Sequence, residues 1–288
     1  MSIDFCHICP TNHLHHLVGK RRAHLALAHL VEADDDYAAF YKSSADGSSI
    51  ILDNSAFEMY KLKKPMYEPD KLVSMGHKIN ASYIVMSDYP NEPGSKTIQA
   101  AIEQAPEFRK NGFKTFFVPQ SRIGDIEDFI STFAWAASSP LVDYIGVSIL
   151  GVPNAYGVES GNKLQRYVSR TKMMTELKRR GLLALCGANS KKIHFLGMVD
   201  GPNEIDNLGL LSSHVDTWDS SAAVWCGLNG IEFDNSPTGL INGKFEEEVD
   251  FNFSTEDMSL FDKAKKNIEF IDRLCGNHSE QRNLWRPL

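Results

Sequence analysis

The fold is indicated most clearly by the run Thr115-Phe-Phe-Val-Pro119, the helical spacing of residues 123–137 and the run Asp143-Tyr-Ile-Gly-Val-Ser148. Both runs are short and apolar, which favours strands that are buried on both faces. A strand, a helix and a second strand in this order form one parallel unit, because the helix returns the chain to the same end of the sheet. This stretch therefore predicts a parallel sheet covered by helices.

The same alternation continues on both sides of this stretch. Further strands are predicted at residues 3–8, 49–53, 83–87, 192–197 and 214–219, with a weaker one at 230–233. Helices are predicted at residues 12–32, 69–80, 95–110, 163–180 and 202–211. This number of repeats favours an α/β fold of the closed TIM-like (β/α)8 barrel type. An open doubly wound sheet is the alternative, since neither architecture requires a glycine-rich phosphate motif and none is present.

Length and composition agree with one barrel. The chain has 288 residues, and such a barrel typically takes about 250. We therefore expect residues 1–288 to form a single domain, with a hairpin and a closing helix at 236–288. Hydrophobic residues make up 42% of the chain and charged residues 23%, which suits a globular core.

Apolar runs, cysteine count and net charge indicate the cellular compartment and the kinds of partner that we expect. No run of about 18 apolar residues is present, and the first residues lack the regions of a signal peptide, so we expect a cytoplasmic protein without membrane contact. The five scattered cysteines suit a reducing compartment. A net charge of −7 argues against broad electrostatic binding to phosphate backbones, although it leaves room for a local basic face.

One cysteine pair raises the question of a metal. Cys6 and Cys9 form a CxxC close to His13, a combination that can bind zinc. The alternative is that Cys6 packs in the first strand as a small hydrophobic residue while the histidines lie on the next helix. We expect no metal and no cofactor.

Polar residues end several of the predicted strands. They are Asp53, Asp88, Gln120, the segment Gly146 to Ser148, Asp216 and Asp219. In a parallel barrel these ends meet at one mouth, where active sites lie. Several carboxylates at one mouth suggest a proton-transfer task or a cationic partner. Each aspartate alone also fits a helix cap or a turn.

A basic helix is predicted after the fifth of these strands. Its residues Arg166, Arg170 and Lys172 could hold phosphates near the mouth, although such clusters are often only a solvated helix face.

In their order along the chain, these strand-end motifs resemble the tRNA-guanine transglycosylase superfamily. The matching segments are Ile50-Ile-Leu-Asp-Asn-Ser-Ala-Phe-Glu58, Tyr83-Ile-Val-Met-Ser-Asp-Tyr-Pro90, Phe117-Val-Pro-Gln120, Tyr144-Ile-Gly-Val-Ser148, Phe195-Leu-Gly-Met-Val199 and Val215-Asp-Thr-Trp-Asp219. Asn54-Ser55-Ala56 stands where the family has Ser-Gly-Gly, and the second strand is one residue shorter than the family's. The resemblance implies a pentosyltransferase that exchanges guanine through a covalent aspartyl intermediate.

The resemblance also assigns roles. It implies that Asp219 is the nucleophile, with Asp216 as the fallback, and that Asp53 shuttles the proton. Asp88 would read the N1 and N2 donors of guanine, while Gln120 and the backbone amides of Gly146 and Val147 would address O6. Ser55, Phe57 and Leu196 would also contact the base.

The family's tRNA members carry a C-terminal cysteine-rich zinc subdomain. After Asp219 this chain has only Cys226 and Cys275, so it resembles the compact 7-deazaguanine DNA transglycosylases of bacteriophages and some bacteria. The resemblance then implies two partners, DNA and a free 7-deazaguanine such as the 7-cyano form, with the target guanine flipped out of the duplex.

Three other functions are open at this point. One is guanine exchange in tRNA, and another is a non-catalytic nucleic-acid-binding subunit with the same fold. The third is an unrelated barrel hydrolase whose carboxylates bind a metal. The sequence leaves the oligomeric state, the deazaguanine and the modified sequence context undecided.

Overall fold

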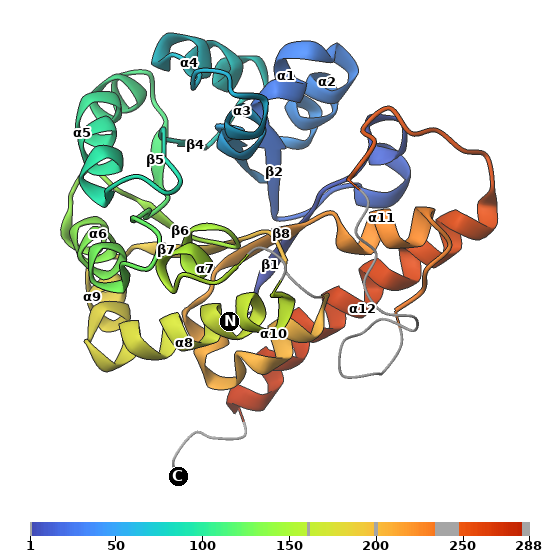
Figure 1. Ribbon diagram of the computed structural model, residues 1–288. Coiled ribbons are helices and arrows are strands. Elements are labelled where there is room, and N and C mark those ends of the chain that lie inside the picture. The colour runs from blue at the N-terminus through green and yellow to red at the C-terminus, as the bar shows by residue number, and fades with distance from the viewer. Residues whose placement is uncertain (1, 160–161, 199–200, 234–247, 284–288) are drawn as a thin grey trace.

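The computed structural model describes residues 2–159, 162–198, 201–233 and 248–283. In this part of the chain, eight parallel strands form one sheet with the hydrogen-bonded order β1-β8-β7-β6-β5-β4-β3-β2. The strands are β1 (Asp4–His7), β2 (Ala23–Leu27), β3 (Ser49–Asp53), β4 (Tyr83–Val85), β5 (Lys114–Phe117), β6 (Tyr144–Ser148), β7 (Lys192–Leu196) and β8 (Thr217–Ser220). The two end strands, β1 and β2, contact each other, so the sheet is a nearly closed TIM-like (β/α)8 barrel, as the sequence predicted (Figure 1).

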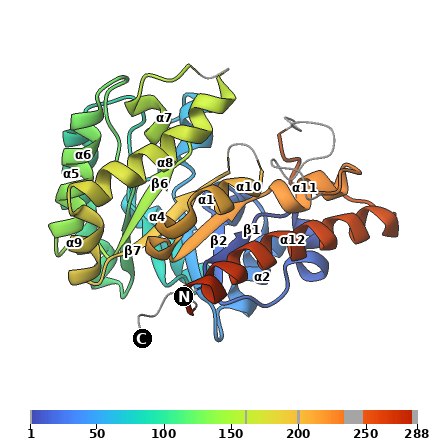
Figure 2. The ribbon, with the colours of Figure 1, turned by 90° about the horizontal axis from the view of Figure 1, so that it is seen from below.

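Helices surround this barrel (Figures 1 and 2). They are α1 (Ala28–Ala33), α2 (Asp35–Ser44), α3 (Ala56–Leu62), α4 (Pro69–Lys78), α5 (Gly94–Lys110), α6 (Ile126–Ser138), α7 (Gly151–Ala155), α8 (Lys163–Arg179), α9 (Leu182–Ala188), α10 (Asn203–Asn207), α11 (Ala222–Leu228) and α12 (Met258–Asn283). Short 3-10 and π segments are η1 (Thr11–His13), η2 (Leu14–Val18) and η3 (Gly209–His214). No helix of the described ranges is long and apolar enough to cross a membrane.

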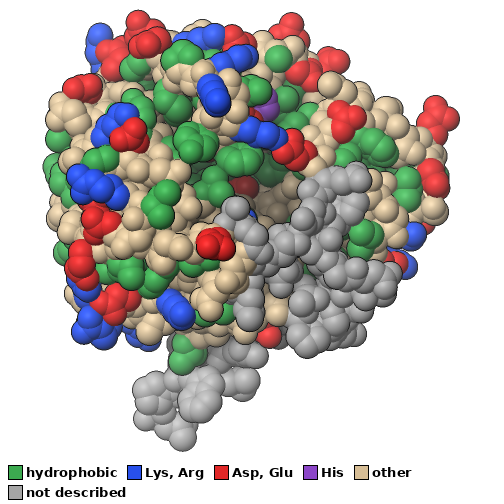
Figure 3. Space-filling model, viewed as in Figure 1, with side chains coloured by type: hydrophobic (Ala, Val, Ile, Leu, Met, Phe, Trp, Pro, Cys, Tyr) green, Lys and Arg blue, Asp and Glu red, His purple; other side chains and the backbone are tan. Residues whose placement is uncertain are grey.

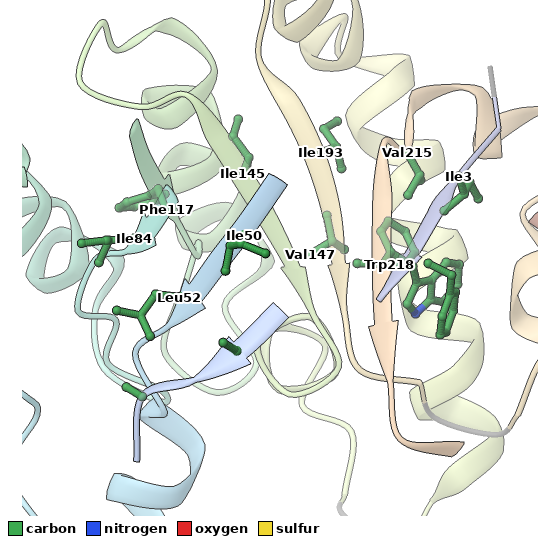
Figure 4. Close-up of a cluster of buried hydrophobic side chains, with 14 of the residues drawn as sticks. Ile3, Ile50, Leu52, Ile84, Phe117, Ile145, Val147, Ile193, Val215 and Trp218 are labelled. Atoms are coloured by element: carbon green, nitrogen blue, oxygen red, sulfur yellow. The ribbon is translucent and has the colours of Figure 1, made fainter. Parts of the chain in front are cut away.

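Side chains alternate between the inside of the barrel and the layer beneath the helices. Leu25, Ile51, Phe116 and Tyr144 belong to one buried cluster inside the barrel. The neighbouring residues along each strand belong to a second cluster that packs against the helices, and ten of its members are labelled in Figure 4. This alternation follows from the two-residue period of a strand, and it turns every second residue near a strand end toward the mouth.

The prediction of a single helix over residues 12–32 is wrong. That stretch contains η1, η2 and then β2, which pairs in parallel with β3 so that Ala26 lies opposite Leu52. The weak strand predicted at 230–233 is absent: these residues follow the end of α11 and have no regular structure. The strand that completes the set of eight is therefore β2, and not the segment at 230–233.

The C-terminal part packs on the outside of the barrel. The closing helix predicted within residues 236–288 is present as α12 (Met258–Asn283). It packs side by side with α11, where a Cβ added to Gly227 would lie 2.3 Å from the backbone of Ala264. The predicted hairpin falls partly on residues 236–247, which lie outside the described residues, while residues 248–257 contain a turn and no strand.

Candidate active site

A cavity of about 350 Å³ opens at the carboxyl ends of the strands. Its volume falls in the range of roughly 300 to 1,000 Å³ that is usual for small-molecule sites. The lining residues are Leu25, Leu27, Asp53, Asn54, Ala56, Phe57, Glu58, Asp88, Pro90, Val118, Gln120, Ser148, Ile149, Leu150, Arg166, Leu196, Gly197 and Asp219. Six residues that the sequence singled out for catalysis or base binding therefore share one cavity. They are Asp53, Phe57, Asp88, Gln120, Leu196 and Asp219.

Asp219 lies on β8, and its side chain is only 13% exposed. Its Oδ1 accepts hydrogen bonds from His194 Nε2 at 2.9 Å and from the backbone N–H of Gly197 at 3.1 Å. Its Oδ2 accepts no hydrogen bond from any residue that the structure describes. One oxygen is thus held by two donors while the other is left for a ligand.

A polar chain inside the barrel orients His194. The hydroxyl of Tyr144 lies 2.8 Å from that of Thr217, which in turn lies 2.5 Å from His194 Nδ1. All these groups are satisfied when Tyr144 donates to Thr217, Thr217 donates to Nδ1, and a neutral His194 donates from Nε2 to Asp219. Such a partner on one ring nitrogen fixes the tautomer at the other.

Asp53 ends β3 at the rim of the cavity. Its Oδ2 accepts the backbone N–H of Ser55 at 2.8 Å, in a tight turn where Ser55 adopts a left-handed φ of 55°. Desolvation raises the pKa of Asp53 well above its usual range, and repulsion from the nearby Glu58 raises it further. Asp53 is therefore a carboxyl group that favours its protonated form.

Asp88 lies in a network of buried amides. Its two oxygens accept hydrogen bonds from Asn54 Nδ2 at 2.9 Å and Gln120 Nε2 at 2.6 Å. Desolvation raises the pKa of Asp88 to about 6, although these two hydrogen bonds oppose the shift. Gln120 Oε1 is buried and has no hydrogen-bond partner in the described part of the chain. In this arrangement Gln120 offers an acceptor, so the expectation that its amide donates to O6 is not met.

Two polar side chains of the cavity, those of Glu58 and Asn54, were not predicted as functional. Glu58 lies on α3, and desolvation together with the charge of Asp219 raises its pKa. Asn54 is fixed by three hydrogen bonds, to Met86 O, to Asp88 and from the backbone N–H of Ala56. Glu58 and Asn54 follow Asp53 closely in the sequence, but helix and turn residues of this type are too common for their spacing to mark a site.

Three residues that were expected to contact the base do not line the cavity. Gly146 lies deeper inside the barrel, where an added Cβ would lie 2.8 Å from side-chain atoms of Leu196 and Phe116. Val147 points into the outer layer (Figure 4). Ser55 is buried, and its hydroxyl bonds His29. The wall expected from Gly146 and Val147 is formed instead by the next residues of the chain, Ser148 to Leu150.

The expectation that Arg170 holds phosphate is wrong. Arg170 lies on α8, but its side chain is fully buried and forms an ion pair with Glu204 at 2.6 Å. Its guanidinium also donates to the carbonyls of Val147, Leu196 and Gly197. Since the amide of Gly197 bonds Asp219, Arg170 instead supports the loop that orients this carboxylate.

The other two basic residues predicted to hold phosphate, Arg166 and Lys172, lie in different places. Arg166 lines the cavity, whereas Lys172 lines a different groove, between α6 and α8, that also contains Glu127, Glu176 and Arg180.

The fallback nucleophile is also excluded. Asp216 lies just before β8, at the opposite end of the barrel from the cavity, and its carboxylate accepts the backbone N–H of Ile193 at 2.8 Å. It caps a strand and does not reach the mouth.

The cysteine pair does not form a joint metal site. Cys6 packs in the cluster inside the barrel and Cys9 in the outer cluster. Burial raises the pKa of both thiols, which disfavours the thiolate that a metal requires. No group of three or more histidine, cysteine or acidic residues within the described ranges is arranged to hold a metal ion.

The fold and the cavity define a (β/α)8 barrel with four carboxyl groups at its mouth. Comparison with known proteins finds no protein-family model that matches this chain and no curated protein that is similar to it.

Proposed function

We propose that this protein is a DNA-guanine transglycosylase that replaces guanine in DNA by a 7-deazaguanine base. The observation that carries the proposal is the pairing of two carboxyl groups in one cavity. Asp219 Oδ2 accepts no hydrogen bond from the described residues, and Asp53 favours its protonated form. A displacement at a sugar carbon requires one carboxyl group as the nucleophile and a second as the proton donor. The order of the strand-end motifs supports the same assignment.

In the first step Asp219 Oδ2 attacks C1′ of the target nucleotide. The bond between C1′ and N9 of guanine breaks, and its electron pair moves into the purine. Asp53 donates its proton to the purine, so guanine leaves as a neutral molecule. The product is an ester between Asp219 and deoxyribose, which conserves the energy of the glycosidic bond.

In the second step the 7-deazaguanine enters the same place. Asp53, now a carboxylate, takes the proton from N9 of the incoming base, and N9 attacks C1′. The ester bond breaks, and its electron pair returns to Asp219. His194 and the Gly197 amide remain on Oδ1 throughout, which stabilises the carboxylate as it leaves.

Recognition of the base is assigned to the amide network and to apolar walls. The N1 and N2 donors of guanine match the acceptors of Asp88 and Gln120 Oε1. Phe57 and Leu196 line the cavity and exclude water, which would otherwise hydrolyse the ester and leave an abasic site. The target nucleotide must be flipped out, at a cost of a few kcal/mol.

Exchange of radiolabelled guanine into duplex DNA and into tRNA, measured in parallel, tests the proposal. We expect incorporation into DNA and a trapped covalent complex between the protein and guanine-containing DNA. Asp219→Ala should abolish the complex, and Asp53→Asn should slow exchange about 10²- to 10⁴-fold. Asp216→Asn is the control, since Asp216 lies away from the cavity. Incorporation only into tRNA, or a complex that persists in Asp219→Ala, would contradict the proposal.

A further inference from the structure

Helix α3 carries an unusual surface beside the cavity. Three of its large hydrophobic side chains are about half exposed, namely Phe57 at 49%, Tyr60 at 57% and Leu62 at 58%. Only four other large hydrophobic residues in the described ranges are exposed, and they are scattered. A cluster of this kind at the rim of a site marks a place where a partner binds.

Three lysines alternate with these apolar side chains. Lys61, Lys63 and Lys64 are all exposed. Lys63 ends the helix in a left-handed conformation, and the backbone N–H of Lys64 then donates to the carbonyl of Met59. We call Phe57, Tyr60, Lys61, Leu62, Lys63 and Lys64 the α3 surface. Figure 3 shows basic and hydrophobic side chains gathered beside a hollow on this face of the molecule.

The charges of the cavity differ from those of its rim. Asp53, Glu58, Asp88 and Asp219 line the cavity, with Arg166 as the one basic residue among the described lining residues. Even with Asp53 protonated, Arg166 is the one basic residue among several carboxyl groups, so the described lining offers phosphate no surplus of positive charge. A nucleotide whose base enters the cavity must therefore have its phosphates held outside, where the lysines of the α3 surface lie.

We propose that the α3 surface binds the DNA strand that carries the extruded guanine. The lysines contact the phosphates beside the target nucleotide, and Tyr60 and Leu62 contact the neighbouring unstacked bases. Lysines that track a backbone and aromatic side chains on which bases stack are the usual means of holding single-stranded nucleic acid. Lys61 is paired with Glu248, an exposed pair that is weak enough to exchange for a phosphate. The inference rests on the proposed function and replaces the α8 residues Arg170 and Lys172 as the grip on DNA.

The test measures DNA binding without any exchange reaction. A labelled guanine-containing duplex is titrated by fluorescence anisotropy over a series of salt concentrations. The variant Lys63→Ala/Lys64→Ala should lower the slope of log affinity against log salt by about 1.8, since each phosphate contact contributes about 0.9. Tyr60→Ala should weaken binding about fivefold or more.

The matched control removes two lysines at the other end of the barrel. Lys110 and Lys178 lie near the C-terminal ends of α5 and α8, so Lys110→Ala/Lys178→Ala changes the net charge equally and should leave the slope unchanged. Circular dichroism checks that each variant is folded.

The outcomes separate this surface from the proposed function. If Lys63→Ala/Lys64→Ala and the control lower the slope equally, or if the wild type binds no DNA, the α3 surface is not the binding surface, even where guanine exchange is observed. If the α3 variants alone lose affinity while the wild type exchanges no guanine, the surface stands and the proposed reaction fails.

Discussion

Asp88 can accept hydrogen bonds with both of its oxygens only while it is ionised. Because burial raises its pKa to about 6, protonation turns one of these two acceptors into an O–H donor as the pH falls below that value. We therefore expect kcat/KM for guanine exchange to fall about tenfold per unit below pH 6. Exchange rates measured between pH 5 and 8 check this.

Asp88→Asn supplies the control for this acid limb. The variant should be slow at every pH and should lose the inflection near pH 6, since no carboxyl group titrates at that position. An unchanged inflection in Asp88→Asn would assign the limb to another group.

At the residue scale, the sequence predicted the carboxylates but not the groups that orient them. Asp53, Asp88 and Asp219 could be found because each ends or follows an apolar strand. His194 lies in the middle of an apolar strand, where a histidine is usually a satisfied core residue. Its contact with Asp219 depends on the register that places His194 opposite Thr217, and that register cannot be read from either segment alone.

At the scale of elements, α8 depends on the buried ion pair of Arg170 with Glu204. Removing one partner leaves the other charge buried without compensation, which costs about 3 to 5 kcal/mol. Arg170→Leu should lower the free energy of unfolding by this amount in urea denaturation. Lys172→Leu, two residues along the same helix but exposed, should change it by no more than about 0.5 kcal/mol.

The double variant Arg170→Leu/Glu204→Leu shows whether the cost arises from the abandoned charge. It should recover much of the lost stability, because an apolar pair of similar volume often replaces a buried ion pair well. A double variant as unstable as Arg170→Leu would assign the loss to packing and to the carbonyls of Val147, Leu196 and Gly197.

The misinterpretation of α8 has a physical origin. Basic residues at 166, 170 and 172 form one cluster in sequence, yet the period of 3.6 residues per turn places Lys172 about 200° around the helix axis from Arg170. Arg170 faces inward with Met173, Met174 and Leu177, all of them buried, whereas Lys172 faces solvent. The apolar residues of this face were available in the sequence, but an arginine within them is usually placed at the surface, since buried arginine is rare.

At the scale of the whole molecule, the closed barrel was predictable, whereas the segment that supplies its eighth strand was not. The alternation of strands and helices gave the architecture, but β2 was taken for helix because Ala23-His-Leu-Ala-Leu27 consists mainly of residues that favour helices. In the fold this segment fills the place beside β3, with Leu25 inside the barrel and Ala26 outside. Tertiary packing thus overrides the local preference.

Hydrogen bonds to α12 connect β1 with the segment that leads into β2. Asp272 of α12 accepts two hydrogen bonds from Arg21, each 3.0 Å long, and one from His7 Nε2 at 3.2 Å. His7 lies on β1 and His24 on β2, and both are almost fully buried. Desolvation, together with the charge of Arg21, lowers the pKa of each histidine to about 4, although the hydrogen bond to Asp272 opposes the shift of His7.

These two histidines favour unfolding in acid. Between pH 6.5 and 4 the folded protein keeps both histidines neutral while the unfolded chain protonates them, so their contribution to the free energy of unfolding falls as the pH falls through this window. Asp53 and Asp88, whose pKa values are raised, contribute in the opposite direction. We expect His24→Leu to reduce the loss between pH 7 and 5 by on the order of 1 to 2 kcal/mol. Urea denaturation at several pH values measures this. His16→Gln, at an exposed position, should leave the pH dependence unchanged, and an equal effect of both variants would show that the buried histidines are not its source.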